Sequence, residues 1–243
     1  MQLTVIRITG YGPWTLTLGS DREHELQILQ ASLYADLQKL FSERGCLVFP
    51  NRHDELFAVT SGLDAQGHAE ILQKISVRGP GLTMAIGRAE EPLDADMMAH
   101  KAREAGELLG DGIFGRPGGQ DGPVTIMHLD VDDVSSQARS RSPYEVSSAM
   151  FGLYARMSSF FVGHGALTFF MGGDNFMVVS GPRAKGAVRG FLDEMNGTGV
   201  ILNCGIGTGG SAREAACRAT GALDKIREIR DSGGKKPQVY ELP

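Results

Sequence analysis

The stretch LTFFMGGDNFMVVS, residues 167–180, predicts a tight β-hairpin. Two apolar runs, 167–171 and 176–180, contain the aromatic and β-branched residues that strands favour. They are joined by Gly172-Gly173-Asp174-Asn175, and glycine, aspartate and asparagine are the residues typical of tight turns. We therefore expect two antiparallel strands, with Asp174 in the turn between them.

The same pattern occurs 120 residues earlier in the chain. Asp54 aligns with Asp174 at that offset, and apolar runs flank both residues. The offset also aligns further identical pairs, which are Tyr34 with Tyr154, Phe41 with Phe161, Gly45 with Gly165, and Ile86 with Ile206. A constant offset over so much of the chain predicts an internal duplication.

Each half is expected to contain the element order βαββαβ followed by a helix. In the first half the strands are predicted at 3–8, 46–49, 56–60 and 82–87, with helices from a capping box at 20–23, at 65–76 and at 94–109. In the second half the strands are predicted at 124–129, 167–171, 176–180 and 200–206, with helices from a capping box at 142–145, at 184–196 and at 211–231, and an edge strand at 239–242.

This order is the ferredoxin-like arrangement, an antiparallel sheet with helices on one face. We predict an α+β protein of two tandem ferredoxin-like units, 1–109 and 123–243. Between them, residues 110–122 are rich in glycine, proline and aspartate and are expected to form a linker.

The composition is that of an ordinary globular chain of 243 residues, 42% hydrophobic and 22% charged. No apolar run approaches the roughly 18–20 residues of a bilayer helix, and the first residues lack a signal-peptide pattern. We therefore expect a cytoplasmic protein without a membrane partner. The net charge of −5 argues against a nucleic-acid partner. The three cysteines have no CxxC spacing, so neither a disulfide framework nor a zinc site is predicted.

An acidic cluster that begins at Asp130 follows the first strand of the second half. In an antiparallel βαββαβ sheet this strand neighbours the hairpin, so Asp130 and Asp174 are expected to lie close together. Two carboxylates with adjacent backbone carbonyls form the kind of oxygen-rich site that Mg²⁺ prefers. Gly172 and Gly173 permit positive φ angles and allow a phosphate or nucleoside to approach the backbone closely.

Several motifs resemble those of the palm-domain nucleotidyl cyclases and diguanylate cyclases. They are FMGGDNF at 170–176, HLDVD at 128–132, CGIG at 204–207 and ATGALDKIR at 219–227. A narrower set, YGPWT at 11–15, LQASLYADL at 29–37 and the GGDNFM run, resembles the GTP cyclohydrolase III family. That family is best known from archaea and consists of tandem palm-like halves, and the similarity extends through almost the whole chain.

The resemblance implies Mg²⁺-dependent hydrolysis of GTP to a formylaminopyrimidine ribonucleotide monophosphate and pyrophosphate. The imidazole ring opens in this reaction, and the formyl group is retained. Asp130 and Asp174, with the Val131 carbonyl, are implied to hold two or more Mg²⁺ ions, and a monovalent cation is a further candidate cofactor. The implied substrate-binding residues of the second half are Gly172, Gly173, Asn175, Lys225 and Arg227. A homo-oligomer is the expected assembly.

The hairpin of the first half, residues 51–55, keeps Asp54 but has lost the glycine pair. Its charge and hydrogen-bonding capacity favour base recognition, and Arg52 and Asp54 are the candidates for reading a purine edge. His53 is a candidate acid or base. The YGPWT string at 11–15 is expected to lie in a loop after the first strand. Tyr11 is a candidate substrate-binding residue, and Trp14 is a candidate for stacking on the base.

The sequence departs from the family pattern in two places. Thr9-Gly10 stands where the family usually has Asp-Asn, and Asp132-Asp133 stand where asparagine is more usual. If the missing pair contacts metal or base, ring opening is lost or the substrate changes, while triphosphate cleavage survives. The alternatives are a nucleotidyl-cyclase-like enzyme, a purine nucleoside triphosphate hydrolase of altered specificity, and a silent nucleotide-binding module. The two retained carboxylates argue against the last.

Overall fold

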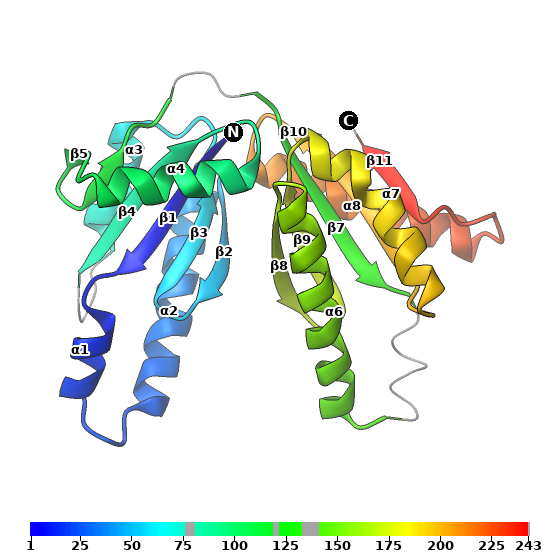
Figure 1. The fold of residues 1–243 in the computed structure, drawn as a ribbon, viewed down its shortest axis with the longest axis horizontal. Coiled ribbons are helices and arrows are strands. Elements are labelled where there is room, and N and C mark those ends of the chain that lie inside the picture. Colours follow the sequence, from blue (N-terminus) through cyan, green and yellow to red (C-terminus); the bar gives the residue numbers. More distant parts are fainter. Residues whose placement is uncertain (76–80, 119–121, 133–140, 243) are drawn as a thin grey trace. The chain divides into compact units, whose positions relative to one another are not determined.

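The computed structural model describes residues 1–75, 81–118, 122–132 and 141–242 (Figure 1). The chain divides into two compact units. Unit 1 comprises Met1–Glu90 and Asp94–Gly122, and unit 2 comprises Glu91–Leu93 and Pro123–Pro243. Within the described ranges, no helix has the length and apolar character needed to cross a membrane.

Unit 1 is built on one mixed sheet. Its strands are β1 (Gln2–Ile8), β2 (Leu47–Arg52), β3 (Glu55–Val59), β4 (Leu82–Arg88), β5 (Leu108–Gly110) and β6 (Ile113–Gly115). Its helices are α1 (Tyr11–Thr17), α2 (Glu23–Ser42), α3 (Ala65–Lys74) and α4 (Pro92–Glu104). The strand order is β2-β3-β1-β4-β6-β5. Strand β1 is antiparallel to β3 and β4, whereas β6 is parallel to β4.

Helices cover both faces of the sheet of unit 1. Phe41 of α2 and Ile6 of β1 belong to a buried core between the sheet and helices α2 and α3. Helix α4 lies on the other face, where Gly87 of β4 allows it to approach. A Cβ atom at Gly87 would collide with the backbone of Ala95 and Ala99. The close approach therefore depends on glycine at this position.

Unit 2 has a five-stranded sheet with the order β11-β10-β7-β9-β8. Its strands are β7 (Val124–Val131), β8 (Leu167–Gly172), β9 (Asn175–Ser180), β10 (Leu202–Gly209) and β11 (Val239–Leu242). Its helices are α6 (Pro143–Gly163), α7 (Pro182–Gly197) and α8 (Ala212–Asp231). Neighbouring strands are antiparallel except β10 and β11, which are parallel.

The sheet of unit 2 lies between two helical layers, and the residues of β10 contact both of them. Ile206 of this strand points into the core formed with α6 and α7. Because side chains alternate along a strand, Gly205 and Gly207 face the opposite side, where α8 lies. A Cβ atom at Gly207 would collide with the backbone of Ala215 and Ala219. The helix that follows each βαββαβ core thus covers the second face of its sheet, in addition to the helices expected on the first face.

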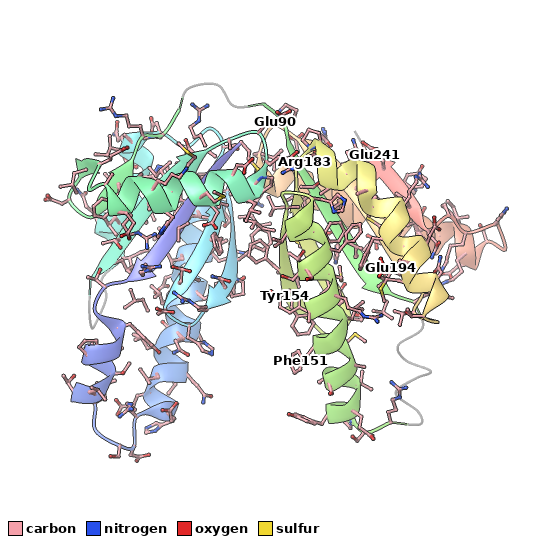
Figure 2. All side chains as sticks on the ribbon, in the orientation of Figure 1. Glu90, Phe151, Tyr154, Arg183, Glu194 and Glu241 are labelled. Carbon is pink, nitrogen blue, oxygen red and sulfur yellow. The ribbon has the colours of Figure 1, made fainter. Side chains whose placement is uncertain are left out.

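The hairpin of unit 2 is anchored through aromatic contacts with α6. Figure 2 shows Phe151 and Tyr154 projecting from this helix. The ring centroids of Phe151 and Phe170 lie 5.8 Å apart, and those of Tyr154 and Phe176 lie 6.4 Å apart. The Tyr154 hydroxyl donates a hydrogen bond of 3.2 Å to the Thr168 carbonyl. One face of the hairpin is therefore fixed by packing, and the turn is held at the end of the sheet.

The α+β class and the two tandem ferredoxin-like units are confirmed. Each unit has its hairpin next to the first strand of the unit. The predicted capping box at the start of α6 is also present, since Ser142 accepts a hydrogen bond from the Glu145 amide and Glu145 caps the Ser142 amide.

Three local predictions in unit 1 were wrong. The capping box at 20–23 is absent: α2 begins at Glu23 after Arg22, and no side chain caps it. The segment after β1, expected as a loop, is helix α1, and Pro13 is tolerated there because it lies in the first turn. The helix expected to reach residue 109 ends at Glu104.

Part of the expected linker 110–122 belongs to the sheet of unit 1. Ile113 pairs with Met84 of β4 and is only 2% exposed, because the core of unit 1 extends under it. Apolar burial therefore determines the structure of 113–115 in spite of the surrounding glycines. Residues 119–121 of that segment lie outside the described ranges.

Candidate functional site

Asp130 lies on the α8 face of the sheet in unit 2. Leu129 and Val131, its neighbours on β7, belong to the core on the opposite face. The strand register places Asp130 directly between Asn175 of β9 and Asn203 of β10. We call these three residues, which cross three adjacent strands, the polar row.

The two oxygens of the Asp130 carboxylate have different surroundings. Oδ2 accepts a hydrogen bond of 2.8 Å from Nη2 of Arg227 on α8. Oδ1 is buried and accepts no hydrogen bond from any residue that the structure describes. A buried acceptor without a donor costs about 1–3 kcal/mol in folding stability. Its presence beside Asp174 indicates a site that is completed by a ligand.

The turn of the hairpin lies next to Asp130. The Val131 amide donates to the Asp174 carbonyl at 3.3 Å, and the Asn175 side chain donates to Oδ1 of Asp174 at 2.7 Å. Gly172 and Gly173 have φ angles of 97° and 62°, in the region that favours glycine, as the sequence predicted. A Cβ atom at Gly172 would meet nothing within 4 Å, so the space over the turn is open.

His128 connects the hairpin to α8. Its Nε2 lies 3.0 Å from Oδ1 of Asn175, and its Nδ1 lies 3.1 Å from the Thr220 hydroxyl. The Asn175 oxygen can only accept, so Nε2 carries the proton and Nδ1 accepts from the hydroxyl. Burial lowers the pKa of His128 below its ordinary value, against the opposing effect of the Asn175 hydrogen bond. A neutral His128 therefore orients Asn175, and Asn175 in turn holds Asp174.

A second charged group borders the polar row at the end of β7. Asp132 accepts a hydrogen bond of 2.6 Å from Lys236 and one of 3.4 Å from the Asn203 amide. Burial raises the pKa of Asp132, but these hydrogen bonds and the charge of Lys236 outweigh it and hold the pKa below its ordinary value. Asp132 and Asp133 together form the second departure from the family pattern, and Asp133 lies outside the described residues.

The oxygen atoms of this site suit a hard divalent cation such as Mg²⁺. The unpaired Oδ1 of Asp130 and the Asp174 carboxylate both belong to the ligand class that this ion prefers. Over the described part of the chain, no three His, Cys, Asp or Glu side chains gather into a metal site. Mg²⁺ commonly binds through one or two carboxylates, with waters and substrate phosphates as its other ligands.

The structure brings together some of the predicted residues of unit 2 and separates one. Asp130, Val131, Asp174, Asn175 and Arg227 are linked by the contacts above. Lys225 is instead exposed and forms an ion pair of 2.6 Å with Glu228. Because Lys225 and Arg227 are two residues apart on a helix, they point in different directions.

In unit 1, the predicted residues of the hairpin form an ion-pair cluster. Arg52 lies 3.3 Å from Asp54 and 3.4 Å from Glu55. Glu55 also accepts hydrogen bonds from Arg7 at 2.9 Å and from Asn51 at 3.0 Å. Burial raises the pKa of Glu55, but the hydrogen bonds and charges of the arginines outweigh it and lower the pKa overall. The predictions missed Arg7 and Glu55, although a charge within the apolar strand LTVIRI was a visible signal.

The other predicted residues of unit 1 lie on its surface elements. His53 is exposed in the hairpin turn. Tyr11 and Trp14 lie on α1 with ring centroids 6.0 Å apart, and the Tyr11 hydroxyl accepts a hydrogen bond from Gln30 of α2. Both rings are half-buried, so each retains an accessible surface.

The two hairpins differ in charge at equivalent positions. In unit 1, the residue after the hairpin aspartate is Glu55, and it pairs across the sheet with Arg7. In unit 2, the corresponding pair is Asn175 and Asp130. Arg7 therefore takes the strand position that the Asp130 carboxylate occupies in the other unit.

Two tandem ferredoxin-like units, one of which holds Asp130 and Asp174 beside a glycine-containing hairpin, define a duplicated βαββαβ protein. The sequence profile of the family described as GTP cyclohydrolase III matches residues 1–238. The chain is 37% identical over 240 residues to GTP cyclohydrolase III of Methanothermobacter thermautotrophicus, covering 93% of this chain and 94% of that protein. It is 34% identical to the Methanocaldococcus jannaschii protein of the same name, with 93% and 88% covered.

The chain belongs to the GTP cyclohydrolase III family and is an enzyme of that kind, which confirms the resemblance seen in the sequence. Solved structures with weaker likeness include the active GGEEF domain of a diguanylate cyclase from Vibrio cholerae, with a TM-score of 0.40 and 12% identity over 50% of this chain and 83% of that one. A bacterial light-regulated adenylyl cyclase has a TM-score of 0.39 and 12% identity over 94% of this chain and 83% of that one.

Proposed function

We propose that the protein is an Mg²⁺-dependent GTP cyclohydrolase that opens the guanine imidazole ring and releases pyrophosphate. The product is a formylaminopyrimidine ribonucleotide monophosphate that retains the formyl group. The relatives are named for action on GTP. The single observation that supports a metal-dependent site in this chain is the buried, unpaired Oδ1 of Asp130 next to the hairpin of Asp174.

When bound, Mg²⁺ would neutralise phosphate charge and lower the pKa of a coordinated water. The Asp130 and Asp174 carboxylates would hold it, and the chain of His128 and Asn175 keeps the second carboxylate in place. Arg227 contacts Asp130 with one nitrogen and Asp224 with another, and 46% of its side chain is exposed. Its guanidinium is therefore positioned to contact a triphosphate that enters over the open turn.

We further propose that the hairpin of unit 1 recognises the base. The Asp54 carboxylate offers two acceptors to the N1–H and exocyclic amine of guanine, a pattern that adenine does not present. Arg52 holds this carboxylate from one side at 3.3 Å. His53 is exposed beside it and is the candidate to move a proton during ring opening.

The test is to incubate the purified protein with GTP or ATP, with and without Mg²⁺. Pyrophosphate release and the ultraviolet spectrum of the purine are followed together. The proposal requires Mg²⁺-dependent pyrophosphate release from GTP with a spectral change caused by ring opening. Equal turnover after removal of divalent ions with a chelator would contradict it.

A second function, pyrophosphate release without ring opening, is favoured by one observation in unit 1. The segment Thr9-Gly10 replaces the usual Asp-Asn, and Gly10 precedes α1 with φ of 63° and no side chain to offer. If ring opening depends on that pair, the chain would cleave the triphosphate and leave the purine spectrum unchanged. The same assay distinguishes the two functions.

A further inference from the structure

Asn203 is a second buried polar group of the polar row without a complete set of partners. Its side chain is part of a residue only 5% exposed, and its Oδ1 accepts no hydrogen bond from the described residues. Uncharged amides are normally excluded from such surroundings unless both of their polar atoms are satisfied. The unpaired oxygen therefore indicates a partner that arrives with a ligand.

The orientation of this amide is determined by its neighbours. Its Nδ2 donates to Oδ1 of Asp132 at 3.4 Å, and Asp132 is itself held by Lys236 at 2.6 Å. The opposite orientation would bring the amide oxygen against a carboxylate, which is electrostatically unfavourable. The amide nitrogen thus faces Asp132, and the oxygen remains available as an acceptor.

Asn203 lies directly across from Asp130 in the register of β10 and β7. Side chains at directly paired positions project from the same face and lie close to each other. Both residues have a buried oxygen without a donor among the described residues. Two neighbouring acceptors cannot satisfy each other, but a single cation can be coordinated by both.

We propose that the Asn203 amide oxygen is a further ligand for a divalent cation held by Asp130. This inference rests on the proposed metal dependence and adds a ligand on the β10 side of Asp130, away from the hairpin. A neutral amide suits this position, since amide and carboxylate oxygens are both ligands for hard cations.

The experiment measures binding of Mn²⁺, a paramagnetic substitute for Mg²⁺, to the full chain by electron paramagnetic resonance without nucleotide. Asn203→Leu has a similar size and lacks the oxygen, and its dissociation constant for Mn²⁺ should rise about tenfold or more. Pulsed measurements in deuterated water should count one additional water on the bound ion, which replaces the lost oxygen. Asn203→Asp keeps an oxygen and should bind Mn²⁺ at least as tightly as the parent protein.

Asn196→Leu is the matched control, because Asn196 is exposed on α7 and pairs with Gln238 at 2.9 Å. It should leave both the dissociation constant and the water count unchanged. An unchanged dissociation constant and water count in Asn203→Leu would overturn the inference while leaving the proposed function intact. If Asn203→Leu does not fold, weakened binding by Asn203→Asp would overturn it. Failure of the parent protein to bind Mn²⁺ without nucleotide would overturn this inference, whereas the proposed function is tested separately by the GTP assay described above.

Discussion

Replacement of Asp130 by asparagine should abolish catalysis without destabilising the metal-free fold. The loss at the ion pair should be modest although the Asp130 side chain is only 9% exposed, because asparagine keeps an acceptor for Arg227, whose side chain is 46% exposed; exposed pairs contribute about 0–1 kcal/mol. The buried Oδ1 of Asp130 finds no donor among the described residues, at a cost of about 1–3 kcal/mol, and asparagine can replace it with an amide nitrogen that donates to the unpaired Oδ1 of Asn203 across the strand pair. The free energy of unfolding should therefore stay the same or rise by up to about 2 kcal/mol.

The assay combines urea unfolding in the presence of a chelator with pyrophosphate release in the presence of GTP and Mg²⁺. Asp64→Ala is the complementary control, because Asp64 caps α3 through the Gly67 amide at 2.8 Å, in unit 1. It should lower the free energy of unfolding by about 0.5–2 kcal/mol and leave the specific activity of the folded protein unchanged.

Two results would refute this reasoning. If Asp130→Asn lowers the free energy of unfolding by more than about 2 kcal/mol, the carboxylate is primarily a structural partner of Arg227. Its ion pair would then stabilise the fold by more than the unpaired Oδ1 destabilises it. If Asp130→Asn releases pyrophosphate at the parental rate, Asp130 does not hold a catalytic cation.

Three further predictions concern other parts of the chain. Burial lowers the pKa of His68 below its ordinary value of 6.5, so its contribution to the free energy of unfolding is complete above that pH and is lost as the pH falls through the lower folded-state pKa. Urea unfolding from pH 7.5 to 5 should show this loss, and His68→Gln should make the free energy of unfolding depend less steeply on pH. Gly207→Ala should lower the free energy of unfolding by about 1–3 kcal/mol, measured by heat or urea, since α8 leaves no room for a Cβ atom. Gly190→Ala, in open space on α7, should be neutral or stabilising, and equal effects of the two variants would contradict the packing described. Asp54→Asn should reduce the excess thermal stabilisation by GTP over ATP while retaining pyrophosphate release, and Asp174→Asn should remove release while retaining some nucleotide binding; the reverse pattern would show that the roles of the two units were exchanged.

Much of the fold could be predicted because its signals are local. Gly172 and Gly173 adopt the positive φ angles that the hairpin requires, and Ser142 caps α6 through contacts within one turn. The predictions failed where packing decides. The buried Ile113 draws a glycine-rich segment into the sheet, and the short helix α1 contains a proline that is compatible with its first turn.

The site was predicted only in part for a related reason. Asp130 and Asp174 are recognisable because a motif surrounds each of them. Asn203 lies just outside the CGIG motif at 204–207, and only the register of β10 against β7 reveals that it lies beside Asp130. Arg227 and Lys225 looked equivalent in sequence, but the helix turns one toward the carboxylate and the other toward Glu228.

The opposite charges of Arg7 and Asp130 show what a duplication within one chain makes possible. An assembly of two identical copies must carry the same residue at this strand position in both, so a mutation there alters both sites at once. In this chain the two positions are encoded separately, and one holds a guanidinium paired with Glu55 while the other holds a carboxylate. Each hairpin can therefore change independently of the other, so substitutions around Asp54 leave the Asp130 and Asp174 carboxylates of the second unit unaltered.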